Sequence, residues 1–271
     1  MPSNSENVFT LKRVSYFYNQ RPALNTISLN VGRGERIAFL GANGSGKSTI
    51  LRLLAGLAFP NHGDVLFFEE NLTDSRFHDE EFFFRFRRSV GVVFQNPDVQ
   101  LFNASVFDEV AFGPLQLRWP KNQVRDKVEE TLSLMGIADL RDRAPHRLSG
   151  GEKKRVAIAS ILVLNPEVLL LDEPTAALDP ASQTLIIDLL TSWSDGSKTI
   201  VTATHDLDAL EDIADRCYLL ENGCIAREGT PMEILHDVAL LEKTRVIRPH
   251  QHRHETATVR PHPHVHRHEL R

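Results

Sequence analysis

The feature that most constrains this chain is a glycine-rich segment, Gly41-Ala42-Asn43-Gly44-Ser45-Gly46-Lys47-Ser48-Thr49, which matches the pattern GxxxxGK[ST]. Glycine lets successive backbone N–H groups turn inward, so that they form a concave nest for an anion. In such a loop the lysine reaches the terminal phosphates of a nucleotide, and the hydroxyl that follows it ligates Mg²⁺. We therefore predict a phosphate-binding loop, with Lys47 on the phosphates and Ser48 on the metal.

The flanking residues support this prediction, because they read as a strand and a helix. Arg36–Leu40 reads as a buried strand, and Ser48–Ala55 reads as a helix with its apolar residues on one face. Gly56 stands near the end of that helix, where glycine is common. The helix N-terminus is expected to direct its partial positive charge at the phosphates.

Composition indicates an ordinary globular protein with one large domain. The chain has 271 residues, of which 41% are hydrophobic and 25% charged, and its net charge is −5 with histidine neutral. A net negative charge argues against a nucleic-acid partner, since phosphate backbones bind basic surfaces.

No membrane span or N-terminal signal is expected. The longest apolar run, Val156–Leu164, is far shorter than the roughly 18 residues that cross a bilayer, and Met1–Asn7 is polar. Cys217 and Cys224 fit no metal or redox spacing, and we expect both to be reduced core residues.

Polar side chains follow three apolar runs that read as parallel strands. They are Gln95 after 90–94, Asp172 and Glu173 after 168–171, and His205 just after 198–203. Such positions face the ligand in an α/β sheet. We predict that Gln95 senses the Mg²⁺ or the γ-phosphate, that Asp172 is the carboxylate on the Mg²⁺ side, and that Glu173 polarises a water for attack. His205 is predicted to hold the γ-phosphate or that water.

A second anion nest is predicted at Leu148-Ser149-Gly150-Gly151-Glu152. Ser149 can cap the helix that follows, and Gly150 and Gly151 allow another backbone or a phosphate to approach closely. Two nests so far apart in one sequence need an explanation that a single nucleotide site does not provide.

The N-terminal segments Val8–Val14 and Leu24–Val31 alternate and read as short strands that pair antiparallel beside the phosphate loop. Tyr16 and Tyr18 point to one face of the first strand. Either ring could stack on an adenine, or both could be half-buried strand aromatics.

The residues from about 97 to 162 read mostly as helices, and Asn122–Met135 is one of them, ended by Gly136. We interpret this stretch as a helical insertion into the α/β core. Before it stands the aromatic cluster Phe82–Phe86, in which residues 82, 83 and 86 are expected to share a helix face. Core packing is the favoured use of these rings, and a partner-binding patch is the alternative.

The C-terminal segment, residues 245–271, is rich in His, Arg and Pro and has too few apolar residues to form a core. Its histidines alternate with other residues, and imidazole is a good ligand for Ni²⁺, Co²⁺ and Zn²⁺. Metal storage or sensing is the favoured interpretation, and a solvated tail without function is the alternative. The histidines concerned are His250, His252, His254, His262, His264, His266 and His268.

The order of these motifs resembles that of the ATP-binding cassette (ABC) ATPases over about residues 8–241. Residues 41–49 match the Walker A loop, 95 the Q-loop, 148–152 the LSGGE signature, 168–172 Walker B, 173 the catalytic glutamate, 177–179 the D-loop and 205 the switch histidine. The resemblance implies an α/β fold: a phosphate-loop NTPase core with a parallel sheet, an antiparallel β subdomain and a helical signature subdomain. It places the ATPase domain at 8–242 and its helical subdomain at about 97–162. The composition of the His-rich tail at 245–271 predicts that the tail is disordered.

The same resemblance explains the two nests. In this family two cassettes pack head to tail, and each ATP with its Mg²⁺ lies between the Walker A loop of one and the signature of the other. It implies that Ser149, Gly150 and Gly151 bind the γ-phosphate in trans, so a homodimer or a pair with a related cassette is expected. It also favours Tyr18 over Tyr16 for adenine stacking, with Glu173, His205 and Lys47 as catalytic residues.

The segments Phe94–Asp98 and Ala111–Pro114 look closest to the ATPases of energy-coupling-factor importers, including cobalt and nickel systems. That resemblance implies a peripheral protein on the cytoplasmic face of the cell membrane, which energises import through an integral membrane subunit. An importer of another micronutrient, such as a vitamin, is the alternative substrate class. Ala176-Ala177 departs from the family, where a serine is common, but removes no group that the chemistry needs.

Two other classes of function are consistent with a phosphate loop. A cytosolic ABC protein of DNA repair or translation usually has two cassettes or a long coiled-coil insertion, and this chain has neither. A phosphoryl-transfer enzyme such as a kinase has no use for the LSGGE segment.

Overall fold

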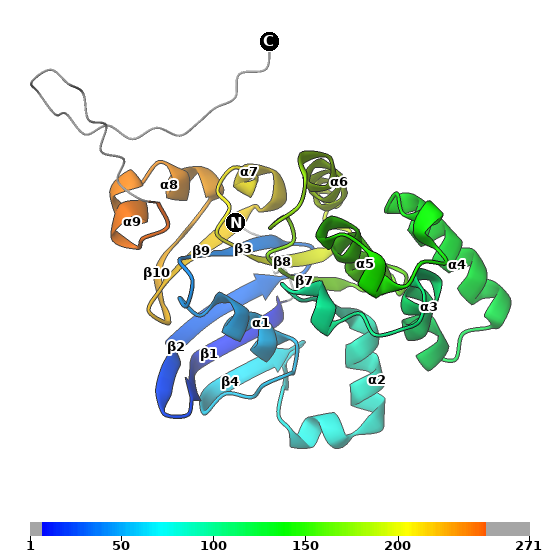
Figure 1. Cartoon of the computed structure of the whole chain (residues 1–271). Coiled ribbons are helices and arrows are strands. Elements are labelled where there is room, and N and C mark those ends of the chain that lie inside the picture. Colours follow the sequence, from blue (N-terminus) through cyan, green and yellow to red (C-terminus); the bar gives the residue numbers. More distant parts are fainter. Residues whose placement is uncertain (1–6, 248–271) are drawn as a thin grey trace, which may run out of the picture.

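The computed structural model describes residues 7–247, and these form two sheets with helices on both sides (Figure 1). The strands are β1 (Asn7–Tyr18), β2 (Arg21–Gly32), β3 (Arg36–Leu40), β4 (His62–Phe67), β5 (Glu70–Asn71), β6 (Val90–Val93), β7 (Val168–Asp172), β8 (Thr199–Thr204), β9 (Arg216–Glu221) and β10 (Cys224–Gly229). The α-helices are α1 (Lys47–Leu54), α2 (Glu80–Ser89), α3 (Val106–Gln116), α4 (Lys121–Leu134), α5 (Gly150–Leu162), α6 (Pro180–Thr191), α7 (Leu210–Ile213), α8 (Pro231–Leu235) and α9 (Val238–Lys243). Short 3₁₀ turns lie at Ser75–His78, Pro97–Val99, Ala138–Leu140 and Pro145–Arg147.

The larger sheet has the strand order β10-β9-β3-β8-β7-β6. All neighbours in it run parallel except the hairpin β9–β10, whose turn contains Asn222 and Gly223. The pairings Leu40↔Thr204, Asp172↔Ala203 and Val93↔Leu171 bring the carboxyl ends of β3, β8, β7 and β6 to one edge. This edge is where an α/β sheet binds its ligand.

The parallel strands are buried on both faces, as their continuous apolar sequences indicate. Successive side chains enter two different cores, because side chains alternate along a strand. Ala38 and Leu40 pack with the helical side of the molecule, whereas Ile37 and Phe39 pack toward the second sheet. The sheet is therefore fixed from both sides, and its carboxyl edge cannot shift without disturbing one core.

The smaller sheet is antiparallel, with the order β2-β1-β4-β5, and confirms the predicted pairing of the two N-terminal strands. It extends those strands to Tyr18 and back from Arg21, and Tyr18 at the end of β1 contacts Arg52 of α1. The register of β1 and β2 shifts between Val14 and Tyr16, and Thr26 has φ +53°. This irregularity lets Leu24 and Ile27 both be buried although they are three positions apart.

Helices α3, α4 and α5 lie together beside the parallel sheet, away from the antiparallel one (Figure 1). They share one core, to which Val110, Val128 and Val156 contribute. These helices fall where the helical insertion is expected; the division into an ATPase domain at 8–242 and a subdomain at 97–162 stays a prediction. The His-rich tail lies mostly outside the described residues.

Burial refines the expectation for the two cysteines. Cys217 is buried and Cys224 is half-buried, and neither forms a disulfide, so only Cys217 is a core residue. Across residues 7–247, every helix is too short or too polar to reach through a bilayer.

The aromatic cluster of α2 is mainly a packing element, although one ring is placed differently from our expectation. Phe82 and Phe86 are fully buried, and the ring of Phe86 lies 4.9 Å from that of Phe67. Phe83 does not lie on the buried face of the helix with Phe82 and Phe86. Its side chain is exposed, as is that of Phe84.

We expect Phe86→Ala to lower the free energy of unfolding by about 3–5 kcal/mol, since it leaves a cavity in the core between α2 and the antiparallel sheet. The matched control is Phe84→Ala on the same helix, whose side chain is 49% exposed; we expect it to cost less than about 1 kcal/mol. Urea unfolding followed by circular dichroism measures both. Equal losses would contradict the packing role of the cluster.

Candidate functional site

The four predicted polar positions meet at the carboxyl edge of the parallel sheet. Gln95 follows β6, Asp172 ends β7, Glu173 follows it, and His205 follows β8. The phosphate loop follows β3 at the same edge. The strand register therefore brings together residues that are more than a hundred positions apart in the sequence.

The phosphate loop has the backbone that its glycines permit. Gly46 has φ +112° and caps the start of α1, and Gly41 has φ +149°. A Cβ at Gly41 would lie 2.5 Å from the carbonyl oxygen of Leu220, so only glycine fits there. Lys47 curls back over the loop and donates to the carbonyl of Gly41 at 2.7 Å and to that of Ala42 at 3.3 Å. Burial lowers the pKa of Lys47, and the nearby Glu173 and Asp172 oppose this.

A cavity of about 550 Å³ opens above the loop. It is large enough for a nucleotide, since small-molecule sites span roughly 300–1,000 Å³. Its lining combines residues of the loop with Gln95, Asp172 and Glu173 and with four residues at the β1–β2 turn. The loop residues are Asn43, Gly44, Gly46, Lys47, Ser48 and Thr49, and the turn residues are Tyr18, Arg21, Pro22 and Ala23.

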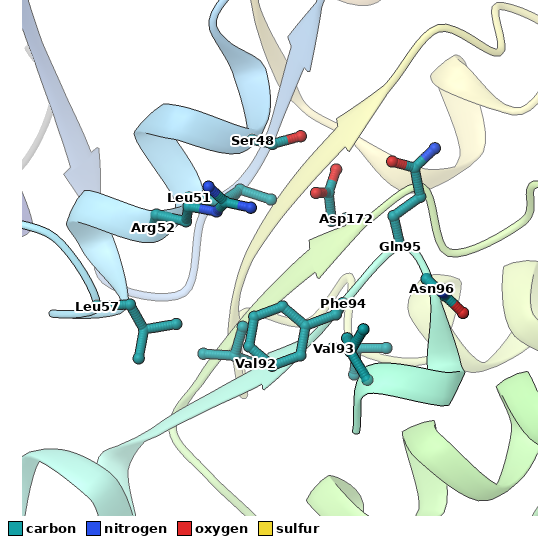
Figure 2. Close-up of a pocket in the computed structure, with 11 residues that line it drawn as sticks. Ser48, Leu51, Arg52, Leu57, Val92, Val93, Phe94, Gln95, Asn96 and Asp172 are labelled. Carbon is teal, nitrogen blue, oxygen red and sulfur yellow. The ribbon is translucent and has the colours of Figure 1, made fainter. Parts of the chain in front are cut away.

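Ser48, Gln95 and Asp172 form a donor set that suits Mg²⁺. They lie at one end of a second, smaller cavity, of about 220 Å³, whose other end is apolar and includes Leu57 and Phe94 (Figure 2). Oδ1 of Asp172 is buried without a hydrogen-bond partner among the described residues. Burial raises the pKa of Asp172, and its hydrogen bond with Ser48 opposes this. An orphaned carboxylate oxygen beside a hydroxyl and an amide fits a hard cation that takes oxygen ligands.

Glu173 and His205 form a direct pair. Nδ1 of His205 lies 2.7 Å from Oε1 of Glu173, and the hydroxyl of Thr204 donates to Oε2 at 3.4 Å. Glu173 is 4% exposed and has φ +50°, which is unusual for a residue with a side chain. Its backbone N–H donates to Ala203 at 2.8 Å, so the neighbouring strand holds this conformation. The Glu173 carboxylate, which lines the cavity, is thus held by two neighbouring side chains, whereas His205 itself does not line the cavity.

The rings of Tyr16 and Tyr18 lie in different surroundings. They contact each other edge to face, with ring centroids 4.9 Å apart. Tyr18 is exposed and lines the cavity, whereas Tyr16 packs against the core. The Tyr18 hydroxyl accepts a hydrogen bond from Nη1 of Arg52 at 3.1 Å, which ties the ring to α1.

The second nest is well formed but is not part of this cavity. Ser149 and Glu152 make a capping box: Oγ of Ser149 accepts from the Glu152 N–H at 3.3 Å, and Glu152 accepts from the Ser149 N–H at 2.7 Å. Ser149 and Gly150 are exposed, and a Cβ on Gly150 would have no neighbour within 4 Å. Neither they nor Gly151 line the cavity above the phosphate loop. One subunit therefore presents this nest outward.

Three side chains at the site carry no distinctive sequence signal. Arg21 lines the cavity from the β1–β2 turn, and Arg52 reaches Tyr18 from α1. Lys154 lies within the run Lys153-Lys154-Arg155, where nothing distinguishes it, yet burial lowers its pKa to about 8. Charged residues in a turn or on a helix are usually solvated, so only the tertiary structure singles these out.

Comparison with known proteins agrees with the fold. The sequence pattern described as "ABC transporter" matches residues 24–176, which is more than half of the chain. This chain belongs to the ABC transporter family. As a member of it, the chain is an ATP-binding and ATP-hydrolysing subunit, and the fold class that we predicted is confirmed.

Two named relatives cover most of the chain. It is 52% identical over 242 residues to the nickel import ATP-binding protein NikO of Rhodobacter capsulatus, which covers 88% of this chain and 95% of the relative. It is 43% identical over 240 residues to the energy-coupling factor transporter ATP-binding protein EcfA of Methanothermobacter thermautotrophicus, which covers 88% and 76%.

Solved structures support the same assignment. CbiO1 of Clostridium perfringens, part of the ABC transporter complex cbiONQ, superposes with a TM-score of 0.74 at 37% identity, covering 89% of this chain and 95% of that one. The ATP-binding cassette MJ0796, a dimer in a post-hydrolysis state with ADP and Pi, superposes with a TM-score of 0.75 at 30% identity, covering 82% and 98%.

We expect Tyr18→Ala to weaken ATP binding by roughly 5- to 150-fold, because stacking of a base on an aromatic ring is worth about 1–3 kcal/mol. Tyr18→Phe is the matched control: it keeps the ring, loses only the bond to Arg52, and should bind within about threefold of the wild type. Equilibrium titration with a fluorescent ATP analogue measures both. An unchanged affinity in Tyr18→Ala would contradict adenine stacking by this residue.

Proposed function

We propose that this protein is the ATP-hydrolysing subunit of an importer of the energy-coupling-factor type, which drives the uptake of nickel or cobalt ions through an integral membrane partner. The observation that carries the proposal is the meeting of Lys47, Gln95, Asp172 and Glu173 around one cavity, in a chain 52% identical to a nickel import ATP-binding protein. His205 does not line this cavity and reaches it through its contact with Glu173. It works at the cytoplasmic face of the membrane as a peripheral subunit.

In the proposed reaction the phosphates lie on the loop 41–49, and Lys47 leaves its loop carbonyls to contact them. Glu173 orients or deprotonates the attacking water, and His205 holds that carboxylate in place through the 2.7 Å contact. Tyr18 stacks on the adenine. Ser48, Gln95 and Asp172 hold Mg²⁺, which neutralises charge on the β- and γ-phosphates when it is bound.

A dimer is part of the proposal, because the nest at 149–151 faces away from the subunit's own cavity. A Cβ added at Gly150 would meet nothing within 4 Å, and this open helix N-terminus suits the γ-phosphate of a nucleotide held by another subunit. The partner is a second copy of this chain or a related cassette. The dimeric state of the MJ0796 structure supports this arrangement.

A surface on α3 and the loop before it is the proposed contact with the membrane subunit. Phe102 and Phe112 are exposed, and their rings pack edge to face with centroids 4.9 Å apart. Buried Glu109 accepts from the backbone N–H groups of Phe102 and Asn103, at 2.9 and 2.7 Å, so the loop holds Phe102 outward. Leu115 extends the apolar surface. A fixed, exposed aromatic pair is typical of a protein interface.

The metal specificity is the finer part of the proposal. The named nickel relative supports it, and the histidines of the tail have suitable chemistry for binding the transported ion or sensing it. A vitamin importer is the second candidate, supported by the energy-coupling-factor relatives, whose names specify no substrate.

We expect Glu173→Gln to keep ATP binding within about threefold and to slow hydrolysis by about 10²–10⁴-fold, the usual contribution of a general base. In vesicles that carry the whole transporter, the same variant should abolish ATP-driven uptake of radioactive nickel and cobalt. Hydrolysis at the wild-type rate would overturn the catalytic assignment. Intact hydrolysis with uptake of a vitamin but of neither metal would overturn the substrate.

We expect Phe102→Glu to weaken co-purification with the membrane subunit by about 30-fold or more, since a charge replaces an aromatic anchor worth about 2 kcal/mol. ATPase activity of the separated subunit should not change, because Phe102 does not line either cavity of the site. The control is Met232→Glu, which changes a residue that is 59% exposed on α8, on the other side of the molecule (Figure 1). Equal recovery of the partner with Phe102→Glu would place the contact elsewhere.

A further inference from the structure

The ammonium group of Lys154 lies where the ends of β6 and β7 meet α5. Lys154 comes from the second turn of α5 and is only 2% exposed. It donates to the backbone carbonyls of Phe94 at 3.1 Å, Gln95 at 3.0 Å and Asp172 at 3.3 Å. These contacts use every hydrogen of the ammonium group. One side chain thus joins three segments that are remote in the sequence.

Other side chains tie the segment after β6 to the same helix. The amide of Gln100 accepts from the Phe94 N–H at 3.3 Å and donates to the Ala157 carbonyl at 2.8 Å. Lys153 forms an ion pair with Asp98 at 2.7 Å. Of Lys153, Lys154 and Gln100, Lys154 is the buried residue, and its ammonium group also contacts Asp172 at the end of β7.

The groups that Lys154 joins belong to different halves of the proposed reaction. Gln95 and Asp172 stand at the metal end of the subunit's own nucleotide cavity. The nest at 149–151 stands at the N-terminus of the helix that carries Lys154, about one turn away. Because a helix is stiff over one turn, a fixed Lys154 fixes the nest relative to that cavity.

We propose that Lys154 is a positioning residue, which holds the metal-binding end of a subunit's own nucleotide site and the nest that it presents to its partner in one geometry. The inference rests on the proposed dimeric function. Lysine suits the place because a compact ammonium group can donate to carbonyls that point inward from different directions, which a planar guanidinium cannot do in the same space. Without Lys154 these three hydrogen bonds are lost, and fewer contacts hold the start of α5 against the ends of β6 and β7.

The test uses Lys154→Met, which keeps the length of the side chain and removes all three hydrogen bonds. We expect ATP affinity of the separated subunit, measured with a fluorescent analogue, to stay within about threefold. In a Glu173→Gln background, which is expected to retain ATP, we expect ATP-dependent dimerisation to be about tenfold weaker in analytical ultracentrifugation. We expect kcat to fall about tenfold in the otherwise wild-type chain; coupling between sites typically amounts to about 5- to 150-fold.

Lys198→Met is the matched control for a general loss of stability. Lys198 is also a partly buried lysine, and it donates to the Pro166 carbonyl at 2.7 Å and to Oδ1 of Asn165 at 2.8 Å, beside the opposite ends of β7 and β8. We expect it to leave kcat and dimerisation near wild type. Lys154→Gln retains two donor hydrogens and should recover part of both. Losses of the same size in Lys198→Met, or no recovery in Lys154→Gln, would show a merely structural role.

Failure of the inference can be told apart from failure of the proposed function. Gly150→Ala adds a methyl group that meets nothing within its own subunit, so it should disturb only the nest that faces the partner. If Gly150→Ala leaves dimerisation and hydrolysis intact, the proposed dimer is wrong. If Gly150→Ala impairs both and Lys154→Met impairs neither, the dimer stands and the role of Lys154 is overturned. Should Lys154→Met not fold, Gln100→Leu replaces it, and wild-type dimerisation of that variant would count against the inference.

Discussion

The hydrogen-bonded parallel register of β3, β8, β7 and β6 is the constraint on which the rest of this structure depends. Each strand is only four to six residues long, but the sheet aligns all their carboxyl ends at one edge. A slip of one residue in β7 would turn Asp172 and its neighbours to the other face of the sheet. The two cores, one on each face, make such a slip costly, because buried apolar side chains would then have to exchange cores.

At this edge the protein concentrates charged side chains, of which Lys47 and Glu173 are buried and Asp172 is half-buried. Burial disfavours the charged form of Lys47 and of Asp172, so the pKa of the lysine falls and that of the aspartate rises. Each is partly stabilised by opposite charge nearby, but Oδ1 of Asp172 still has no partner among the described residues. Such a site favours a ligand that brings both phosphate and a divalent cation, since together they satisfy the two kinds of group.

The same chain presents a second predicted nest, at residues 149–151, which does not line its own cavity. In the proposed dimer, association with another subunit brings both nests to one nucleotide. The relative position of the two nests within a subunit is then part of the proposed catalytic geometry, and the contacts of Lys154 and Gln100 join the helix that carries the second nest to the ends of β6 and β7.

The sequence by itself determined the local structures: the glycine turn, the capped helix at Ser149, the buried strands and the polar residues that end them. These depend on backbone freedom, side-chain capping and hydrophobic runs, which act over a few residues. It also indicated Tyr18, although only through a family resemblance. The tertiary structure alone decided that Tyr18 and not Tyr16 lines the cavity, that Phe83 is exposed while Phe82 and Phe86 are buried, and that Lys154 is a buried contact rather than a solvated charge. These outcomes depend on which segments pack against each other across long sequence separations, and no local pattern specifies that.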